Sequence, residues 1–393
     1  MKIIRPTPRG SRRRRQRSAS DAIRVTSQTA YVESLSPWPT DGFGLGRIEA
    51  LLTELGDPQL EYPSVHVVGT NGKSTVTRTA EELLAQAGLH VGAYLSPHVR
   101  GWSERIRVGG AEANFGAAID RVRDAAEHVG ATQFELLTAA ALAEFAAARV
   151  DVAVVEAGLG GRYDATNVLR SPVQVLTNVS LEHTEVLGPT REAIAAEKLA
   201  VVQSGATVVV GEPEWEELAR ENGAGGVVVA GRSNLALALA AAEALLGRPV
   251  DGHVDVRLPG RLERISDDPL EIWDGAHNLA GVGYVLARLP SARYTIVASI
   301  LADKDVEGMV AALSALGTGF VATTSSSTRA LSSADLAERA TRYFEHVEAV
   351  DEPAEALARG RARGGPLLVT GSLYLLADLA KDESVRWRTL ATS

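Results

Sequence analysis

Cysteine is absent from this chain of 393 residues. Its absence excludes disulfide bonds, thiolate metal ligands and a cysteine nucleophile, and it fits a reducing compartment such as the cytoplasm. No uninterrupted apolar run reaches the ~18 residues that a membrane-spanning helix needs, so we expect no membrane segment. With 45% hydrophobic and 23% charged residues, the composition is that of a globular protein long enough for two or three domains.

Acidic residues are missing from the first twenty positions, which carry one lysine and seven arginines. The whole chain has a net charge of -9, so the remainder is clearly acidic. A basic segment of this kind can bind nucleic acid or an anionic surface, or act as a transit peptide. Because no apolar face accompanies the arginines, we interpret residues 1–25 as a disordered tail. The acidic remainder argues against nucleic acid as the main ligand.

A glycine-bracketed loop, Gly69-Thr70-Asn71-Gly72-Lys73-Ser74, follows a short β-branched run. Its glycines allow backbone N–H groups to point at phosphate oxygens, while Lys73 can reach the terminal phosphates and the Ser74 hydroxyl a magnesium ion. The strict nucleotide-loop motif has a further glycine where this chain has Val67. The strand before the loop and the helical spacing of apolar residues after it favour a polyphosphate site over a plain strand-turn-helix.

Segments typical of strands and helices alternate along the rest of the chain, which predicts an α/β fold with parallel sheets. The expected architecture is a doubly wound ATPase domain of the P-loop type over residues 26–252, followed by a smaller Rossmann-like domain over 253–393. A short hairpin is expected where Gly109-Gly110 follows Arg105–Val108. The expected strands are Val65–Val68, Val91–Leu95, Val152–Glu156, Val173–Thr177, Thr207–Val210, Glu271–Trp273, Tyr294–Ser299, Phe320–Thr323, Val347–Val350 and Leu367–Thr370.

Polar residues stand at or after the ends of strands in the first domain, where α/β proteins build their sites. Glu156 closes one predicted strand, and a carboxylate there can ligate magnesium bound to a nucleotide. His183 follows another strand, although a lone histidine is more often structural. Lys198 lies on a predicted helix, where an exposed lysine is the usual outcome.

Several motifs in order along the chain resemble the folylpolyglutamate synthase and dihydrofolate synthase family of the Mur ligase superfamily. The resemblance extends from about Leu35 to Leu379. The motifs are Gly69 to Ser74, Leu95-Ser96-Pro97-His98, Ser103-Glu104-Arg105-Ile106, Phe134 to Thr138, Glu156 to Asn167, Glu197-Lys198, Pro259 to Glu263, Asp274-Gly275-Ala276-His277-Asn278, Asp303-Lys304-Asp305 and Thr370-Gly371-Ser372.

The resemblance implies ATP-driven amide formation, in which a folate-type carboxylate takes the γ-phosphoryl group of ATP and the amine of L-glutamate attacks the acyl phosphate. Dihydropteroate and tetrahydrofolate are the implied acceptors. The chemistry needs no protein nucleophile, in agreement with the lack of cysteine, and it relies on positioning and charge neutralisation.

The resemblance also implies roles for individual residues. Lys73, Lys198, His183 and Glu156 are expected to be catalytic, with Lys198 at the lysine that the family carbamylates. Two magnesium ions are expected, with ligands among Ser74, Ser96, Glu156 and His183. Nucleotide contacts are expected from Thr70, Asn71, Gly72, Lys73, Ser74, Asn234, Arg261, Asp274 and His277. A pterin pocket is expected at Thr132, Phe134 and Asp164, although Phe134 is equally well explained as a core residue.

Three positions depart from the family pattern. Ser74 follows Lys73 directly, as in the muramyl-peptide ligases, where this family usually has a glycine between the two. Glu182 stands where the family usually has an aspartate. The segment from Gly211 to Asn234 is shorter than in the family, so we expect a region of extra strands to be lost. A Mur-type ligase acting on another carboxylate, and a nucleotide-binding module without catalysis, therefore remain alternatives. We expect a cytoplasmic monomer that binds neither nucleic acid nor membranes.

Overall fold

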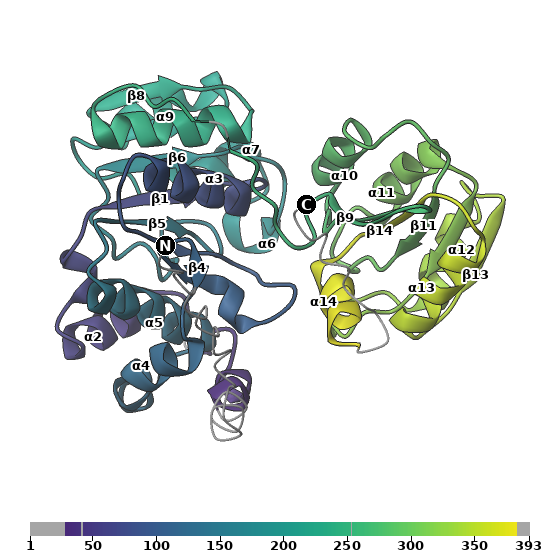
Figure 1. Ribbon diagram of the computed structural model, residues 1–393, viewed down its shortest axis with the longest axis horizontal. Coiled ribbons are helices and arrows are strands. Elements are labelled where there is room, and N and C mark those ends of the chain that lie inside the picture. The colour runs from purple at the N-terminus through teal and green to yellow at the C-terminus, as the bar shows by residue number, and fades with distance from the viewer. Residues whose placement is uncertain (1–27, 41, 253, 383–393) are drawn as a thin grey trace, which may run out of the picture.

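The computed structural model describes residues 28–40, 42–252 and 254–382, and these form two α/β lobes, each with its own sheet (Figure 1). This arrangement confirms the expected α/β class and its two-domain organisation. The lobes are joined through the segment between α9, which ends at Leu246, and β9, which begins at Glu263. None of the described helices combines the length and apolar character needed to cross a membrane.

The first lobe is built on an eight-stranded sheet in the order β4-β3-β2-β5-β1-β6-β7-β8. The strands from β2 to β8 pair in parallel, whereas β3 and β4 form the antiparallel hairpin that the double glycine predicted. The strands are β1 (Ser64–Val68), β2 (Val91–Tyr94), β3 (Ile106–Val108), β4 (Ala111–Glu112), β5 (Val152–Glu156), β6 (Val173–Leu176), β7 (Thr207–Val210) and β8 (Gly226–Val229).

Helices cover both faces of this sheet because alternate strand residues point to opposite sides. Val65 and Val67 of β1 pack with α3 and α9 on one face, while Ala153 and Val155 of β5 pack with α4 and α5 on the other. The helices of the lobe are α2 (Gly46–Glu54), α3 (Lys73–Gln86), α4 (Phe115–Val129), α5 (Gln133–Ala148), α6 (Thr184–Leu187), α7 (Arg191–Leu199), α8 (Glu216–Glu221) and α9 (Asn234–Leu246).

The second lobe has a six-stranded sheet in the order β13-β12-β11-β14-β10-β9, in which only β9 runs antiparallel to its neighbour within the described residues. The fully buried ring of Trp273 lies among the residues that α13 and α14 cover. Its elements are β9 (Glu263–Asp267), β10 (Leu270–Trp273), α10 (Leu279–Leu286), β11 (Thr295–Ala298), α11 (Val306–Leu313), β12 (Gly319–Ala322), α12 (Ser333–Ala340), β13 (His346–Ala349), α13 (Pro353–Ala362), β14 (Leu367–Thr370) and α14 (Leu373–Lys381).

All ten expected strands are present, with ends that shift by a residue or less, but two observed strands were not expected. β9 pairs with β10 as a hairpin at one edge of the second sheet, and β8 forms the outer edge of the first. The short segment between Gly211 and Asn234 therefore keeps a helix, α8, and a strand, β8. The basic tail lies outside the described residues.

Candidate active site

The phosphate loop connects β1 to α3, as the sequence predicted, and its two glycines meet different requirements. Gly69 has φ of 144°, and a Cβ there would come within 1.9 Å of the Thr177 hydroxyl. Gly72 has φ of 85°, and a Cβ there would come within 2.5 Å of the Asn234 side-chain oxygen. Both positions therefore need glycine. Asn234, the first residue of α9, is thus placed beside the loop.

Residues that follow β6 hold the loop in place. The Thr70 N–H donates to the Asn178 carbonyl at 2.9 Å, and the Asn71 N–H donates to the Asn178 side chain at 3.1 Å. The Thr177 hydroxyl donates to the Asn71 carbonyl at 2.7 Å, and Ser180 N–H donates to the Thr70 hydroxyl at 3.1 Å. These contacts fix the backbone of the loop on the β6 side.

Lys73 and Lys198 both donate to the Gly69 carbonyl, at 3.0 Å and 2.9 Å. Lys198 is fully buried at the end of α7, and its nearest acidic partner is Glu182 at 3.4 Å. Burial lowers the pKa of Lys198 to about 8, with Glu182 opposing the shift and Lys73 adding to it. Burial also acts to raise the pKa of Glu182, but Lys198 and Lys73 outweigh it, so that this pKa is lowered.

Glu156 lies at the carboxyl end of β5, between residues of two other segments. The Ser74 hydroxyl donates to one carboxylate oxygen at 3.0 Å, and the Ser96 N–H donates to the other at 3.0 Å. Burial raises the pKa of Glu156, while Lys73 and these hydrogen bonds oppose the shift. Within the described residues no basic side chain forms an ion pair with Glu156, so a bound cation would offset the burial of its charge.

Three of the four expected metal ligands, Ser74, Ser96 and Glu156, therefore meet. Their hydroxyl and carboxylate oxygens are of the type that magnesium prefers. Among the residues that the structure describes, no three histidine or acidic side chains converge as a metal cluster. The oxygen set at Glu156 fits magnesium, because this ion is commonly held by one or two carboxylates and keeps several water ligands.

His183, the fourth expected ligand, belongs to a second group of charges. Its backbone is left-handed, with φ of 48°, directly after Glu182. Burial lowers its pKa to about 4; Glu182 opposes this, and Lys304 and Lys198 add to it. The imidazole is therefore neutral at pH 7, as a metal ligand must be. Lys73 acts electrostatically on both Glu182 and Glu156 and so links the two groups.

The second lobe brings Arg261, Asp274 and His277 to the same region, as the motifs predicted. The Asp274 carboxylate accepts the Leu262 N–H at 2.7 Å and the Ala276 N–H at 2.8 Å, which fixes two loops. Burial raises the pKa of Asp274, opposed by Arg261, and burial lowers the pKa of His277. Arg261 lies close enough to Glu156 to oppose the rise of its pKa, so the second lobe faces the group formed by Ser74, Ser96 and Glu156.

The side chains expected to bind the pterin are engaged in contacts within the protein. The Thr132 hydroxyl and Glu135 form a capping box that begins α5. The ring of Phe134 lies 6.2 Å from that of Tyr94, and Asp164 accepts the Leu159 N–H at 2.7 Å and the Thr166 hydroxyl at 2.5 Å. These three residues share the region at the start of α5 and the loop after β5, but the polar side-chain atoms of Thr132 and Asp164 already have partners.

Sequence reasoning did not select Asn178 or Asn278, although both carry contacts at the phosphate loop. Asn178 follows a predicted strand end, which is a usable signal for a site residue. Asn278 is the last residue of the Asp-Gly-Ala-His-Asn motif. Its side-chain N–H donates to the Asn71 side-chain oxygen at 3.1 Å, and the Asn71 side-chain N–H donates to the Asn278 side-chain oxygen at 3.5 Å, so the pair joins the two lobes. A contact of this kind between lobes is set by tertiary structure and leaves no signal in local sequence.

Comparisons with known proteins agree with this arrangement. Residues 67–257 match the family model of the Mur ligase middle domain, and residues 260–373 match that of the Mur ligase, glutamate ligase domain. A dihydrofolate synthase/folylpolyglutamate synthase of Mycobacterium tuberculosis is 34% identical over 388 residues, covering 78% of this chain and 80% of the relative. One of the same name from Escherichia coli is 34% identical over 342 residues, covering 75% and 81%.

Solved structures resemble the chain over most of its length. Folylpolyglutamate synthase of Mycobacterium tuberculosis, complexed with ADP and AMPPCP, superposes with a TM-score of 0.83 at 29% identity, covering 92% of this chain and 99% of that one. Escherichia coli FolC with DHPP and ADP gives 0.80 at 31% identity, covering 90% and 96%. A bifunctional folylpolyglutamate synthase/dihydrofolate synthase with Mn, AMPPNP and L-glutamate bound gives 0.78 at 30% identity, covering 90% and 96%.

Proposed function

The chain belongs to the folylpolyglutamate synthase and dihydrofolate synthase family of Mur ligases, and on that premise we propose that it joins L-glutamate to the carboxylates of dihydropteroate and tetrahydrofolate at the expense of ATP. The observation that carries the proposal is the convergence of Lys73, Lys198 and Glu156 around the turn at Gly69. Two lysines and a magnesium-type carboxylate at one phosphate loop suit the transfer of a phosphoryl group.

The residues around the loop divide the work of the reaction. The backbone N–H groups at the N-terminus of α3 bind the triphosphate, since those of Thr70 and Asn71 already donate to Asn178. Lys73, which now contacts the Gly69 and Thr70 carbonyls, turns toward the phosphates and neutralises charge as the γ-phosphoryl group moves to the substrate carboxylate. Magnesium held by Ser74, Ser96 and Glu156 supplies further positive charge when bound.

The second step is the attack of the glutamate amine on the acyl phosphate, which releases phosphate and forms the amide. Arg261, Asp274 and His277 of the second lobe complete the nucleotide site beside Asn234 of the first. Because an acyl phosphate is hydrolysed by water, contact between the lobes protects it until the amine arrives. Thr132, Phe134 and Asp164 are proposed to shape the pterin end of the site.

We infer further that the chain acts as a monomer, since the two lobes of one chain supply all of these residues. We also infer that it acts in the cytoplasm. Size-exclusion chromatography with light scattering tests the monomer directly. A dimer whose separation by dilution abolishes turnover would contradict it.

The direct test of the function is phosphate release from ATP with L-glutamate and magnesium, with the amide product identified by mass. We expect release with dihydropteroate and with tetrahydrofolate, and a loss of at least about a hundredfold in kcat for Glu156→Gln. Arg220→Gln, on the exposed face of α8, is the matched control and should behave as wild type. Release with a muramyl-peptide precursor alone would overturn the proposal.

A further inference from the structure

A buried series of hydrogen bonds connects β1 with the loop after β5. The Nε2 atom of His66 lies 2.7 Å from the Thr166 hydroxyl, which donates to the Asp164 carboxylate at 2.5 Å. We call these three residues the buried network, since their exposed fractions are 2%, 0% and 5%. Val65 and Val67 of β1 pack on the side of α3 and α9, so His66 between them faces the opposite side of the sheet.

The hydrogen bonds of the network favour an ionised Asp164. Its carboxylate also accepts the Leu159 N–H at 2.7 Å and the Thr166 N–H at 3.0 Å. An ionised carboxylate only accepts, so the Thr166 hydroxyl donates to it and in turn accepts a hydrogen bond from Nε2 of His66. Burial lowers the pKa of His66 to about 3, so the ring is neutral at pH 7 and its single N–H is the one on Nε2. Burial raises the pKa of Asp164, and the hydrogen bonds from Thr166 and Leu159 oppose this shift.

Through Asp164 the network also fixes the path of the loop after β5. The carboxylate joins Leu159, near the start of this loop, to Thr166, further along it. Between β5 and Leu159 lies Gly158, where a Cβ would come within 2.5 Å of the Phe134 ring, so that ring packs directly on the loop backbone. A shift of the loop would therefore change the surroundings of Phe134.

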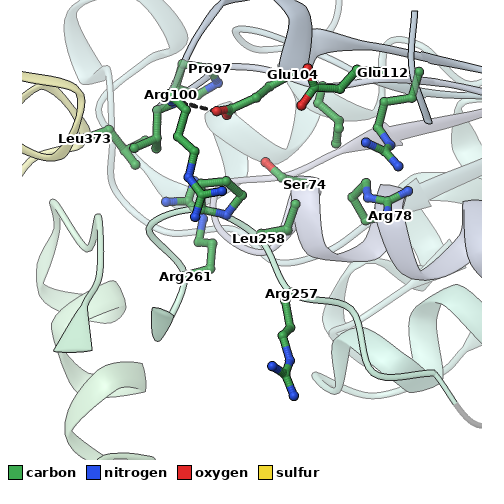
Figure 2. A pocket seen from close by; sticks show the side chains of 14 residues that line it. Ser74, Arg78, Pro97, Arg100, Glu104, Glu112, Arg257, Leu258, Arg261 and Leu373 are labelled. Atoms are coloured by element: carbon green, nitrogen blue, oxygen red, sulfur yellow. Dashed lines mark hydrogen bonds between the residues drawn. The ribbon is translucent and has the colours of Figure 1, made fainter. Parts of the chain in front are cut away.

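The buried network lies apart from the pocket between the two lobes. Ser74 of α3 and Arg261 of the second lobe line that pocket, whereas none of the described residues of β1 or of the loop after β5 does (Figure 2). The hydrogen bonds that hold the phosphate loop also come from other residues, those that follow β6. Loss of one hydroxyl from the network should therefore affect the end of the site at Phe134 and leave the nucleotide end unchanged.

We propose that His66 and Thr166 are positioning residues for the pterin end of the site, which hold the Asp164 carboxylate and, through it, the loop that packs on Phe134. A negative charge beside an aromatic ring suits a pterin, which carries N–H donors on a flat ring. The inference rests on the proposed function and deepens it, because it makes the affinity for the pterin depend on two residues that are too deeply buried to contact this ligand from solvent.

The test removes the central hydroxyl of the network without changing its volume. Thr166→Val should raise the KM for dihydropteroate about three- to tenfold and leave the KM for ATP within about twofold, while Thr166→Ser, which keeps the hydroxyl, should recover the wild-type value. If the valine variant does not fold, His66→Leu and His66→Gln repeat the comparison, since glutamine keeps an N–H donor. Ser171→Ala is the matched control, because it removes another buried hydroxyl, one that pairs with Ser64 of β1 at 2.7 Å, and both KM values should stay unchanged.

Calorimetric titration with dihydropteroate gives a second measurement that is independent of turnover. If dihydropteroate is not ligated but binds to the wild type and to Thr166→Ser more tightly than to Thr166→Val, the proposed function fails and the positioning role stands. If it is ligated with the same KM in all folded variants, or if the KM for ATP or the control Ser171→Ala changes equally, the positioning role alone fails. Absence of both ligation and binding would overturn both.

Discussion

At the scale of single residues, the most informative side chain is Lys198, because a buried lysine with few acidic partners is rare. It lies under the loop after β5, where the Arg162 N–H donates to the Glu197 carbonyl at 3.0 Å and a Cβ at Gly161 would come within 2.6 Å of the Lys198 carbonyl. The pKa of about 8 leaves about a tenth of this amine neutral at pH 7, far more than for an exposed lysine. Only the neutral amine can react with carbon dioxide.

We therefore predict that Lys198 is carbamylated and that the modification is needed for turnover. In ¹³C-bicarbonate the wild-type enzyme should show a carbamate signal by NMR that Lys198→Ala lacks, and kcat should fall at least about a hundredfold in that variant. Because protonation blocks the reaction, signal and activity should both decrease as the pH falls below about 8. Lys198→Arg is the charge-matched control and should also be inactive, since a guanidinium stays protonated. Full activity in Lys198→Ala would contradict the assignment.

At the scale of elements, helix α5 is where a binding role and a structural role compete for the same side chain. Thr132 forms the N-terminal cap of α5, and its N–H donates to the Glu135 carboxylate at 2.8 Å. Arg47 of α2 contacts the same glutamate at 3.2 Å. The cap therefore joins α2 and α5 at the expected pterin pocket. The Thr132 hydroxyl is already engaged in hydrogen bonds with Glu135.

We predict that Thr132→Ala lowers the free energy of unfolding by about 1 kcal/mol, through loss of the cap. Thr132→Ser keeps a hydroxyl and should keep the stability. Urea denaturation measures the free energy of unfolding of each variant, and the KM for dihydropteroate measures any contact of Thr132 with the pterin. If only the cap matters, that KM should stay within about twofold in both variants. A large rise of KM in both, with normal stability in the serine variant, would show that the methyl group of Thr132 contacts the substrate.

The elements themselves were largely predictable, because buried parallel strands are near-continuous apolar runs between turn residues. Strand β8 was missed because it is a short edge strand with Val228 and Val229 40% and 42% exposed, in a segment that was expected to lack strands. The phosphate loop and Glu156 were also predictable from strand ends. The burial of Lys198 was not, since it depends on how α7 packs beneath a distant loop.

At the scale of the whole molecule, the two lobes meet at the phosphate loop itself. The amide of Asn71, in the loop, pairs with that of Asn278, which also caps α10 by accepting the Gly281 N–H at 2.7 Å. A second bridge joins Arg100 of the first lobe to Glu263 of β9. The amide pair thus links the residue that follows Thr70 to the start of a helix in the other lobe, so that nucleotide binding and the contact between lobes should be coupled.

We predict that Asn71→Ala and Asn278→Ser each raise the KM for ATP about two- to fivefold, as expected for the loss of a hydrogen-bonded pair. Serine is a good N-cap residue, so Asn278→Ser keeps the cap of α10 and removes only the amide. The backbone contacts of Asn71 with Asn178 also persist in the alanine variant. If the two side chains act through one another, the double variant should have no higher KM than either single variant. Additive effects would mean that each asparagine contacts the nucleotide by itself, and the coupling between the lobes would then have to arise elsewhere.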